Sequence, residues 1–214
     1  MNKKINVSID VALIIVTIKG AINNGLFTLE TLLSCLGVAG VILIAYGRQE
    51  NFIFNIAQNI LNVLVSAKSK LFGDAVMAVY FLGTQFFGID IWRNHRDENG
   101  NLITDNKTDW TVIVVAIFIG GVLLGGLSWL LGGAYIIMDA FNNSTAIVAQ
   151  YLQIIKRKRV GWALWAITNI VGVYIWLGVG QPQIAIMYLV FTINSIRGYL
   201  NWGKLAENKV QGRF

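Results

Sequence analysis

Charged residues are scarce in this chain. Of its 214 residues, 13% are Asp, Glu, Lys or Arg and 56% are hydrophobic, whereas a typical soluble domain is about 25% charged. The mean hydropathy is +0.62. The few charges are clustered, which leaves uncharged tracts long enough to cross a bilayer. The composition therefore excludes an ordinary soluble domain and indicates an integral membrane protein in contact with lipid.

Residues that carry chemistry are also few. The single cysteine, Cys35, excludes an intramolecular disulfide. The single histidine, His95, lies in a hydrophilic stretch, where solvation is its simplest role. The sequence has no metal-ligand spacing, no nucleophile–base pair and no phosphate-binding glycine motif. A membrane enzyme would need one of these, so we expect no catalytic residue, no metal and no cofactor.

The chain is basic, with a net charge of +6. A basic chain can bind nucleic acid, but in a membrane protein Lys and Arg gather in cytoplasmic loops, so no nucleic-acid partner is expected. If the segment after the first span is cytoplasmic, the 17 Lys and Arg residues divide 12 to 5 in favour of that side. This predicts a multi-pass protein of the inner (plasma) membrane with a cytoplasmic carboxyl terminus.

Seven tracts are long and apolar enough to span. They are Leu29–Tyr46, Asn51–Ser66, Leu71–Trp92, Trp110–Leu131, Gly133–Ile155, Trp162–Val179 and Ile184–Trp202. A shorter apolar segment, Val7–Lys19, precedes them. Its uncharged core, Val11–Ile18, is too short to span, and no small-residue cleavage site follows it, so we expect an interfacial or packed helix and not a signal peptide. If this segment did span, the amino terminus would move to the cytoplasmic side.

An internal repeat becomes visible when the chain is shifted on itself so that Ser34 superposes on Ser144. Further identical residues then superpose at the same offset through three successive spans. The matched pairs are Asn59 with Asn169, Ile60 with Ile170, Val63 with Val173, Ala75 with Ala185, Met77 with Met187, Phe81 with Phe191, Gly88 with Gly198, and Trp92 with Trp202. We infer two three-helix units joined by one linking helix. An odd linker makes the units parallel, and transporters built this way bind substrate near the midplane between the halves.

The expected fold is an all-α integral membrane protein with seven transmembrane helices arranged as three, one and three. It assigns residues 1–28 to the amino-terminal interfacial or packed helix, 29–92 to the first repeat, 93–109 to a cytoplasmic loop, 110–132 to the linking helix, 133–202 to the second repeat and 203–214 to a cytoplasmic tail.

A stripe of amide side chains follows one face of the second span, and we call it the amide stripe. It comprises Asn55, Gln58, Asn59 and Asn62, at helical spacings of 0, +3, +4 and +7. Unpaired carboxamides in hydrocarbon are costly, so the stripe faces the protein interior, either lining a cavity or bonding to neighbouring helices. Four amides exceed what helix association needs, which favours the cavity.

The sixth span carries the repeat counterpart of this stripe. Trp162, Trp165 and Asn169 share one face there, directly after the cations of residues 156–159. Trp162 is either an interfacial anchor or the outer edge of a site. Trp165 lies one turn deeper, where stacking on a flat ligand is favoured, and the Asn169 amide can donate and accept hydrogen bonds.

Other polar residues of the spans fit the same cavity, and those expected to contact the substrate are Gln85, Gln150 and Asn194. The acidic residues Asp139 and Glu30 fall near span ends, and no carboxylate sits convincingly at the midplane. Coupling to protons or sodium usually uses such an acid, so an uncoupled carrier of a flat ligand rich in hydrogen-bonding groups is predicted, such as a nucleoside-like vitamin.

Three stretches resemble the PnuC family of vitamin transporters over roughly Glu30–Lys204. They are "KRKRVGWALWAITN" ending at Asn169, "YLVFTINSIRGYLNW" ending at Trp202 and "LFGDAVMAVYFLGTQFFGIDIW" ending at Trp92. The resemblance implies a fold similar to the SWEET sugar transporters, a homotrimer, and facilitated diffusion of nicotinamide riboside, which a cytoplasmic kinase then traps. In that family the W-x-x-W-x-x-x-N motif contacts the substrate, which assigns this role to Trp162, Trp165 and Asn169, with Gln85 and Asn194 beside them.

The identity of the cargo stays open at this point. Family members often carry an acidic residue just before the first tryptophan, where this chain has Val160-Gly161, and the loop Arg93–Asp109 is unusually long. Relatives that carry thiamine, riboflavin or a deoxynucleoside are therefore alternatives. A non-transporting receptor or assembly subunit is a third class, but it would not explain the matched stripes.

Overall fold

The computed structural model describes residues 3–69, 72–130, 136–178 and 180–211. These residues form eight α-helices and one π-helical turn. The elements are α1 (Lys3–Asn24), α2 (Leu29–Ala45), α3 (Asn51–Lys68), α4 (Phe72–Arg93), α5 (Trp110–Leu130), α6 (Ile136–Gln150), η1 (Tyr151–Ile155), α7 (Val160–Gly178) and α8 (Pro182–Gln211). The all-helical prediction is confirmed.

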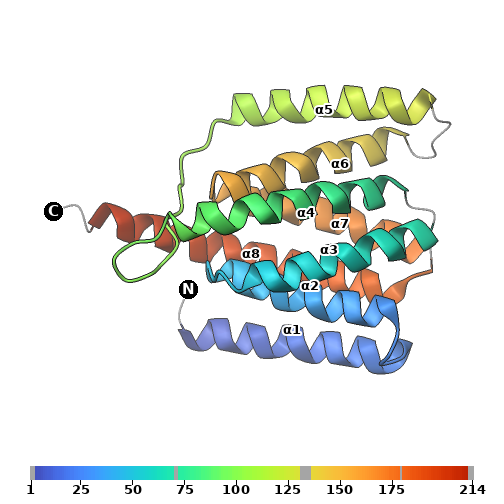
Figure 1. Cartoon of the computed structure of the whole chain (residues 1–214), viewed down its shortest axis with the longest axis horizontal. Helices are drawn as coiled ribbons and strands as arrows, with labels where there is room; N and C mark the ends of the chain where they lie inside the picture. Colours follow the sequence, from blue (N-terminus) through green and yellow to red (C-terminus); the bar gives the residue numbers. More distant parts are fainter. Residues whose placement is uncertain (1–2, 70–71, 131–135, 179, 212–214) are drawn as a thin grey trace.

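The helices lie side by side in one layered bundle, with successive helices running in opposite directions (Figure 1). The central helices α2, α3, α4, α6, α7 and α8 pack on one another, and α7 with α8 forms the most extensive contact. At one edge α1 packs on α2 and α8; at the other edge α5 contacts α6. Both α1 and α5 are therefore peripheral, and the central six helices enclose the interior.

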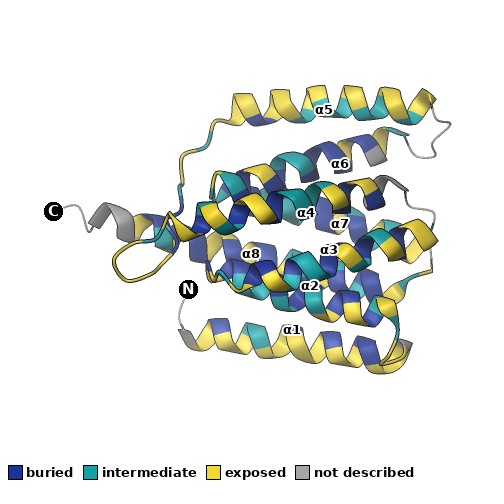
Figure 2. Ribbon diagram, in the orientation of Figure 1, coloured by how far each residue is buried: buried dark blue, intermediate teal, exposed yellow. Residues whose placement is uncertain are grey.

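The outer surface of the bundle is apolar. Residues that face outward on α1 and α5 are exposed along almost their whole length (Figure 2), and Ile113 is the one buried residue of α5. Large hydrophobic side chains such as Phe118 and Leu130 are 69% and 73% exposed. A soluble protein rarely exposes such a continuous apolar surface, whereas a bilayer solvates it. The exposed face is therefore the lipid-facing face.

Apolarity alone identifies only some of the helices as spans. Four of the described helices are long and apolar enough to cross a membrane, in α1, α4, α5 and α7. The others in the bundle are shorter or carry buried amides, such as the amide stripe of α3. Because those amides point inward, they lower the mean hydropathy of a helix without exposing polar groups to lipid.

The first helix is longer than the sequence predicted. The expected segment Val7–Lys19 is part of a helix of 22 residues, and its packing on α2 and α8 agrees with a packed helix. The predicted segment was too short because Asp10 and Lys19, which flank the uncharged core Val11–Ile18, were taken as its limits. In the structure Asp10 forms an ion pair with Arg197 of α8 and accepts a hydrogen bond from the Tyr46 hydroxyl at 2.6 Å. A paired charge does not end a membrane helix.

Two later segments, the fifth tract and the last helix, also differ from the expected bounds. The fifth tract leaves α-helical geometry after Gln150 and continues as a π-helical turn. The last helix runs on to Gln211, so most of the predicted tail 203–214 is helical. The side chain of Asp139 and the stretch 131–135, where the fourth tract was expected to end, lie outside the described residues.

The loop between α4 and α5 is folded against one end of the bundle. Leu102 is 1% exposed and packs among the tryptophans at this end. The Thr104 hydroxyl donates to the carbonyl of Trp202 at 2.9 Å, and the backbone of Asp105 exchanges hydrogen bonds with Arg157 and Arg159 at 3.0 Å each. The loop is thus hydrogen-bonded to the segment that precedes α7 and to α8 at this end of the bundle.

Candidate functional site

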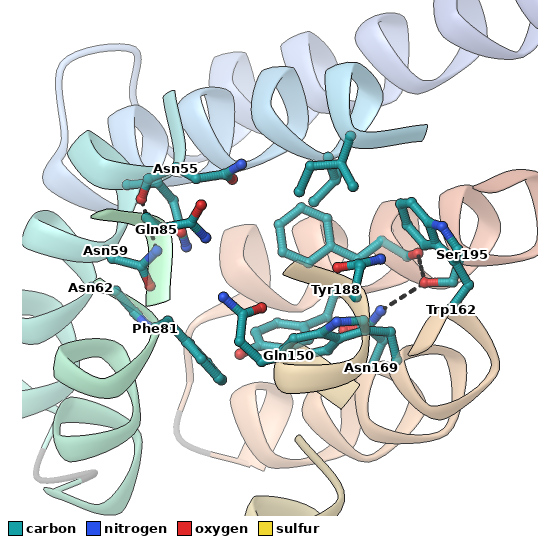
Figure 3. Close-up of a pocket in the computed structure, with 16 residues that line it drawn as sticks. Asn55, Asn59, Asn62, Phe81, Gln85, Gln150, Trp162, Asn169, Tyr188 and Ser195 are labelled. Carbon is teal, nitrogen blue, oxygen red and sulfur yellow. Dashed lines mark hydrogen bonds between the residues drawn. The ribbon is translucent and has the colours of Figure 1, made fainter. Parts of the chain in front are cut away.

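A cavity lies inside the central six helices. Its volume is about 90 Å³, several times the roughly 15 Å³ that one water molecule needs. Side chains from both halves of the chain converge on it (Figure 3). The lining residues are Val41, Ile44, Asn55, Gln58, Asn59, Asn62, Phe81, Gln85, Gln150, Gln153, Trp162, Trp165, Asn169, Tyr188, Phe191 and Ser195.

Nine of the ten residues predicted to contact the substrate line this cavity; the exception is Asn194. The side-chain amide of Asn194 donates to the carbonyl of Val41 at 2.7 Å, and its oxygen accepts from the guanidinium of Arg197. The first bond holds α8 against α2, and the second lies within α8, so both ends of this amide are engaged. The structure therefore places Asn194 beside the cavity wall and not in it.

The amide stripe forms one wall of the cavity. All four side chains are buried, and the hydrogen bonds of Asn55, Asn59 and Asn62 in the described chain run along α3 itself. Asn55 donates to the Asn51 side chain at 3.2 Å, and Asn59 donates to the backbone of Asn55 at 2.7 Å. Side chains that bonded helices together would reach α2 or α4 instead. The stripe thus has the geometry of a cavity wall.

The two tryptophans of α7 occupy different environments. Trp165 is partly exposed and meets Phe81 edge to face, with ring centroids 5.5 Å apart. Trp162 is 2% exposed and packs edge to face on Trp202 at 5.7 Å. Gly198 makes this possible, because a Cβ there would overlap the Trp162 ring. Trp162 is therefore a buried wall residue and not an interfacial anchor.

Asn169 is held by one hydrogen bond. Its Nδ2 donates to the Ser195 hydroxyl at 3.2 Å, and this hydroxyl donates its own proton to the carbonyl of Phe191 at 2.8 Å. Asn169 is 2% exposed. Its Oδ1 has no hydrogen-bond partner within the described residues.

The π-helical turn brings two glutamines to the cavity. Gln150 ends α6 and donates from Nε2 to the Thr84 hydroxyl at 2.6 Å, and Gln153 lies inside the turn. Both side chains are buried. π-turns are rare and occur often at functional sites. The sequence indicated the polarity of this segment but not the turn.

Several lining residues were not predicted as contacts, among them Phe81, Phe191, Tyr188 and Ser195. The repeat contained a signal for three of them. Phe81 and Phe191 are a matched identical pair, and Ser195 is the repeat counterpart of Gln85. Extending the repeat from the amide stripe to every matched position would have included them.

Five polar atoms of the lining are buried without a hydrogen-bond partner in the described chain. Three are donors and two are acceptors: Trp162 Nε1, Trp165 Nε1, Gln153 Nε2, Gln85 Oε1 and Asn169 Oδ1. A buried polar group left unpaired costs about 1–3 kcal/mol. Five unpaired polar atoms in one cavity are explained by a polar ligand or by water molecules that supply the missing hydrogen bonds. The cavity is therefore suited to a ligand that both donates and accepts.

None of the described residues that line the cavity is charged. The ion-paired Asp10 and Arg197 neutralise each other behind the wall formed by α2 and α8. Farther out, at the loop end, burial lowers the pKa of Arg157, and the nearby Asp105 opposes this shift. The arrangement can therefore stack, donate and accept, but it offers no fixed charge to a ligand.

Comparison with known proteins agrees with this architecture. Residues 28–204 match the family model described as nicotinamide mononucleotide transporter. The chain is 28% identical to the nicotinamide riboside transporter PnuC of Neisseria mucosa, over 84% of this chain and 73% of that protein. It is also 28% identical to the PnuC of Haemophilus influenzae, over 80% and 77%. A crystal structure of the vitamin B3 transporter PnuC superposes with a TM-score of 0.82 at 25% identity, covering 97% of this chain and 94% of that one.

The family model covers more than half of the chain, and the two halves of the cavity both lie within the matched residues. Members of this family are membrane transporters of small molecules and not enzymes. The chain therefore belongs to the nicotinamide mononucleotide transporter family, together with the PnuC proteins.

Proposed function

We propose that this protein carries nicotinamide riboside across the inner (plasma) membrane by facilitated diffusion, and that the cavity between its halves is the binding site. The observation that carries the proposal is the cavity lining: two indole rings, a set of amides and five polar atoms without a partner in the described chain. A pyridine ring, a carboxamide and a ribose need such groups. The names of the two relatives point to the same cargo.

The absence of charge in the described lining favours the riboside over the mononucleotide that the family model names. A phosphate carries close to two negative charges and is usually held by Arg or Lys. The described lining offers neither. The riboside carries a delocalised positive charge on its pyridine ring, which the face of a tryptophan attracts without any carboxylate. Trp165 is the ring we assign to this stacking, because it is the partly exposed one.

The remaining contacts follow from position. Trp162 borders the pocket toward the loop end, and the amide of Asn169, two turns farther along the same helix, bonds to the ligand. Gln85, Gln150 and the amide stripe line the rest of the cavity, where the ribose hydroxyls would find partners. Asn194 supports the wall instead of contacting the substrate.

Reciprocal hydrogen bonds support an arrangement of two three-helix repeats, and such an arrangement would support the transport proposal. The indole of Trp92 donates to the carbonyl of Ile154 at 2.9 Å, and the indole of Trp202 donates to the carbonyl of Ile44 at 3.0 Å. Trp92 is the repeat counterpart of Trp202 and Ile44 that of Ile154, so each bond is the repeat image of the other. The helix bounds follow the same offset, since α4 and α8 begin at matched positions and α3 and α7 end at matched positions. With α5 as the linker, these correspondences support the 3+1+3 arrangement.

The same geometry supports α1 as an eighth span. It lies antiparallel to α2, and it begins at the end of the bundle where α8 ends (Figure 1). Apart from Arg197, which is paired with Asp10 inside the bundle, the cations whose side chains are described divide ten to two between the ends, which predicts that both termini are cytoplasmic. The ten are Lys4, Arg48, Arg93, Arg96, Lys107, Lys156, Arg157, Lys158, Arg159 and Lys204, and the two are Lys19 and Lys68.

Facilitated diffusion is the mode that the cavity supports. The described lining contains no carboxylate, and Asp10, which lies behind the wall of α2 and α8, is engaged by Arg197 and Tyr46. Net uptake in the cell would then depend on a cytoplasmic kinase that phosphorylates the riboside and traps it. We expect a homotrimer, which native mass spectrometry in detergent would reveal.

Binding titrations test the cargo directly. The purified protein should bind nicotinamide riboside and should bind nicotinamide mononucleotide at least tenfold more weakly, since the phosphate meets no cation. Thiamine, riboflavin and deoxynucleosides are the competitors to include. If one of these competitors bound more tightly than nicotinamide riboside, that compound would be the cargo. If none of the tested compounds bound, a receptor or assembly subunit would be favoured.

A further inference from the structure

We propose that Ser195 is a positioning residue that makes the site select a carboxamide over a carboxylate on the ligand ring. The inference rests on the proposed function. It concerns a hydroxyl group of α8 that the sequence did not single out. Ser195 is 2% exposed and lies beside Asn169 at the cavity wall (Figure 3).

The hydrogen bonds of Ser195 leave one orientation for the neighbouring amide. A hydroxyl has a single proton, and that of Ser195 goes to the carbonyl of Phe191 at 2.8 Å. Only lone pairs remain to face Asn169, so the amide must turn its NH2 group toward Ser195, and it does so at 3.2 Å. The Asn169 oxygen is then the half of the amide left for a ligand, and it has no other partner in the described chain.

A fixed acceptor at this point distinguishes two ligands of nearly identical shape. The carboxamide of nicotinamide riboside can donate an N–H to Asn169 Oδ1. The carboxylate of nicotinic acid riboside has no donor, and it would place negative oxygens against the amide oxygen. The unmade hydrogen bond and the repulsion both disfavour the carboxylate.

A second hydroxyl, on another wall of the cavity, orients a neighbouring amide in the same way. The Thr84 hydroxyl donates to the carbonyl of Phe81 at 2.7 Å and accepts from Gln150 Nε2 at 2.6 Å. Phe81 and Phe191 are matched residues of the two repeats. A hydroxyl from each half, Thr84 in α4 and Ser195 in α8, donates to its own helix and accepts from an amide of the second half at the cavity. The same arrangement therefore fixes the orientation of two amides at this site.

The test compares two ribosides on one variant. Ser195→Ala removes the acceptor, so the Asn169 amide can turn over and present its NH2 group to the ligand. We expect wild type to prefer nicotinamide riboside over nicotinic acid riboside in isothermal titration, and Ser195→Ala to reduce that preference by about tenfold or more, the scale of one unpaired group. Ser195→Thr keeps the hydroxyl and should keep most of the preference.

Thr192→Ala is the matched control. It removes a hydroxyl of the same helix that donates to the carbonyl of Tyr188 at 3.0 Å and does not line the cavity, so the preference should be unchanged. If Ser195→Ala does not yield folded protein, Ser195→Cys, whose thiol accepts weakly, should shift the preference in the same direction. An unchanged preference in the folded variant, or equal affinity of wild type for both ribosides, would overturn the inference. Failure of wild type to bind nicotinamide riboside would instead refute the proposed function.

Discussion

The ion pair between Asp10 and Arg197 offers the sharpest test of how α1 is held. The Arg197 side chain is 1% exposed, and its guanidinium contacts the Asp10 carboxylate and the Asn194 oxygen. It also lies 5.2 Å from the ring of Tyr46. Replacing Asp10 by Ala removes the partner but leaves the buried cation. Breaking a buried pair on one side typically costs about 3–5 kcal/mol.

This cost should be visible in thermal unfolding. For a chain of this size, each kcal/mol corresponds to roughly 2–4 °C in the melting temperature, so Asp10→Ala should melt on the order of 10 °C below wild type in detergent. Replacing both partners with apolar residues, as in Asp10→Leu with Arg197→Met, should recover most of the loss, because well-packed apolar groups can substitute for a buried pair. Asn6 and Asn201, which bond amide to amide between the same helices, provide the control, and Asn6→Ala should cost only about 1 kcal/mol.

The reasoning would be wrong if Asp10→Ala melted like wild type, or if the double variant melted as low as the single one. The first result would mean that Arg197 is solvated in the membrane protein, with α1 loosely attached. The second would mean that α1 needs the charge pair itself for its position and not merely a neutral interior.

Three further predictions concern the cavity. Trp165→Ala should weaken binding of nicotinamide riboside about 5- to 150-fold in titration, the equivalent of one stacked ring at roughly 1–3 kcal/mol, and Trp165→Phe should restore much of it; an unchanged dissociation constant in the alanine variant would place the ring outside the site. Gly198→Ala should lower the melting temperature, because the new methyl group would overlap the Trp162 ring, and a melting curve like that of wild type would contradict the packing. In a Cys35→Ser background, Asn59→Cys should react with a small hydrophilic thiol reagent and nicotinamide riboside should slow the reaction, whereas complete inertness would mean that the amide stripe faces protein and not a cavity.

The sequence predicted the cavity wall better than the helix bounds. The amide stripe and the tryptophans of α7 were found because burying a carboxamide in a membrane is costly, which makes any such stripe informative. Nine of the ten expected residues share one cavity for that reason. Asn194 is also a polar residue of a span, but its amide forms hydrogen bonds with Val41 and Arg197 and does not line the cavity. Only the positions of its neighbours could reveal this.

The bounds of the amino-terminal helix could not be predicted from its own residues alone. Asp10 interrupts the apolar run, and its ion-pair partner lies outside α1. The partner, Arg197, lies 187 residues away. A charge pair between distant segments allows both charges to lie inside the bundle, so α1 could not be delimited correctly from its own residues. The repeat carried more information than either helix alone, because it matched Trp92 with Trp202. It did not predict the reciprocal hydrogen bonds that these two residues form.

Uptake of radiolabelled nicotinamide riboside by proteoliposomes tests the central claim most directly. The internal concentration should rise to the external one and stop there, with or without a proton or sodium gradient, and unlabelled nicotinamide riboside should compete more strongly than the mononucleotide. Asn169→Leu vesicles should take up the label more slowly, since the ligand would lose a hydrogen bond. Accumulation above the external concentration under a gradient would contradict facilitated diffusion, and no uptake by folded wild-type protein would contradict the account as a whole.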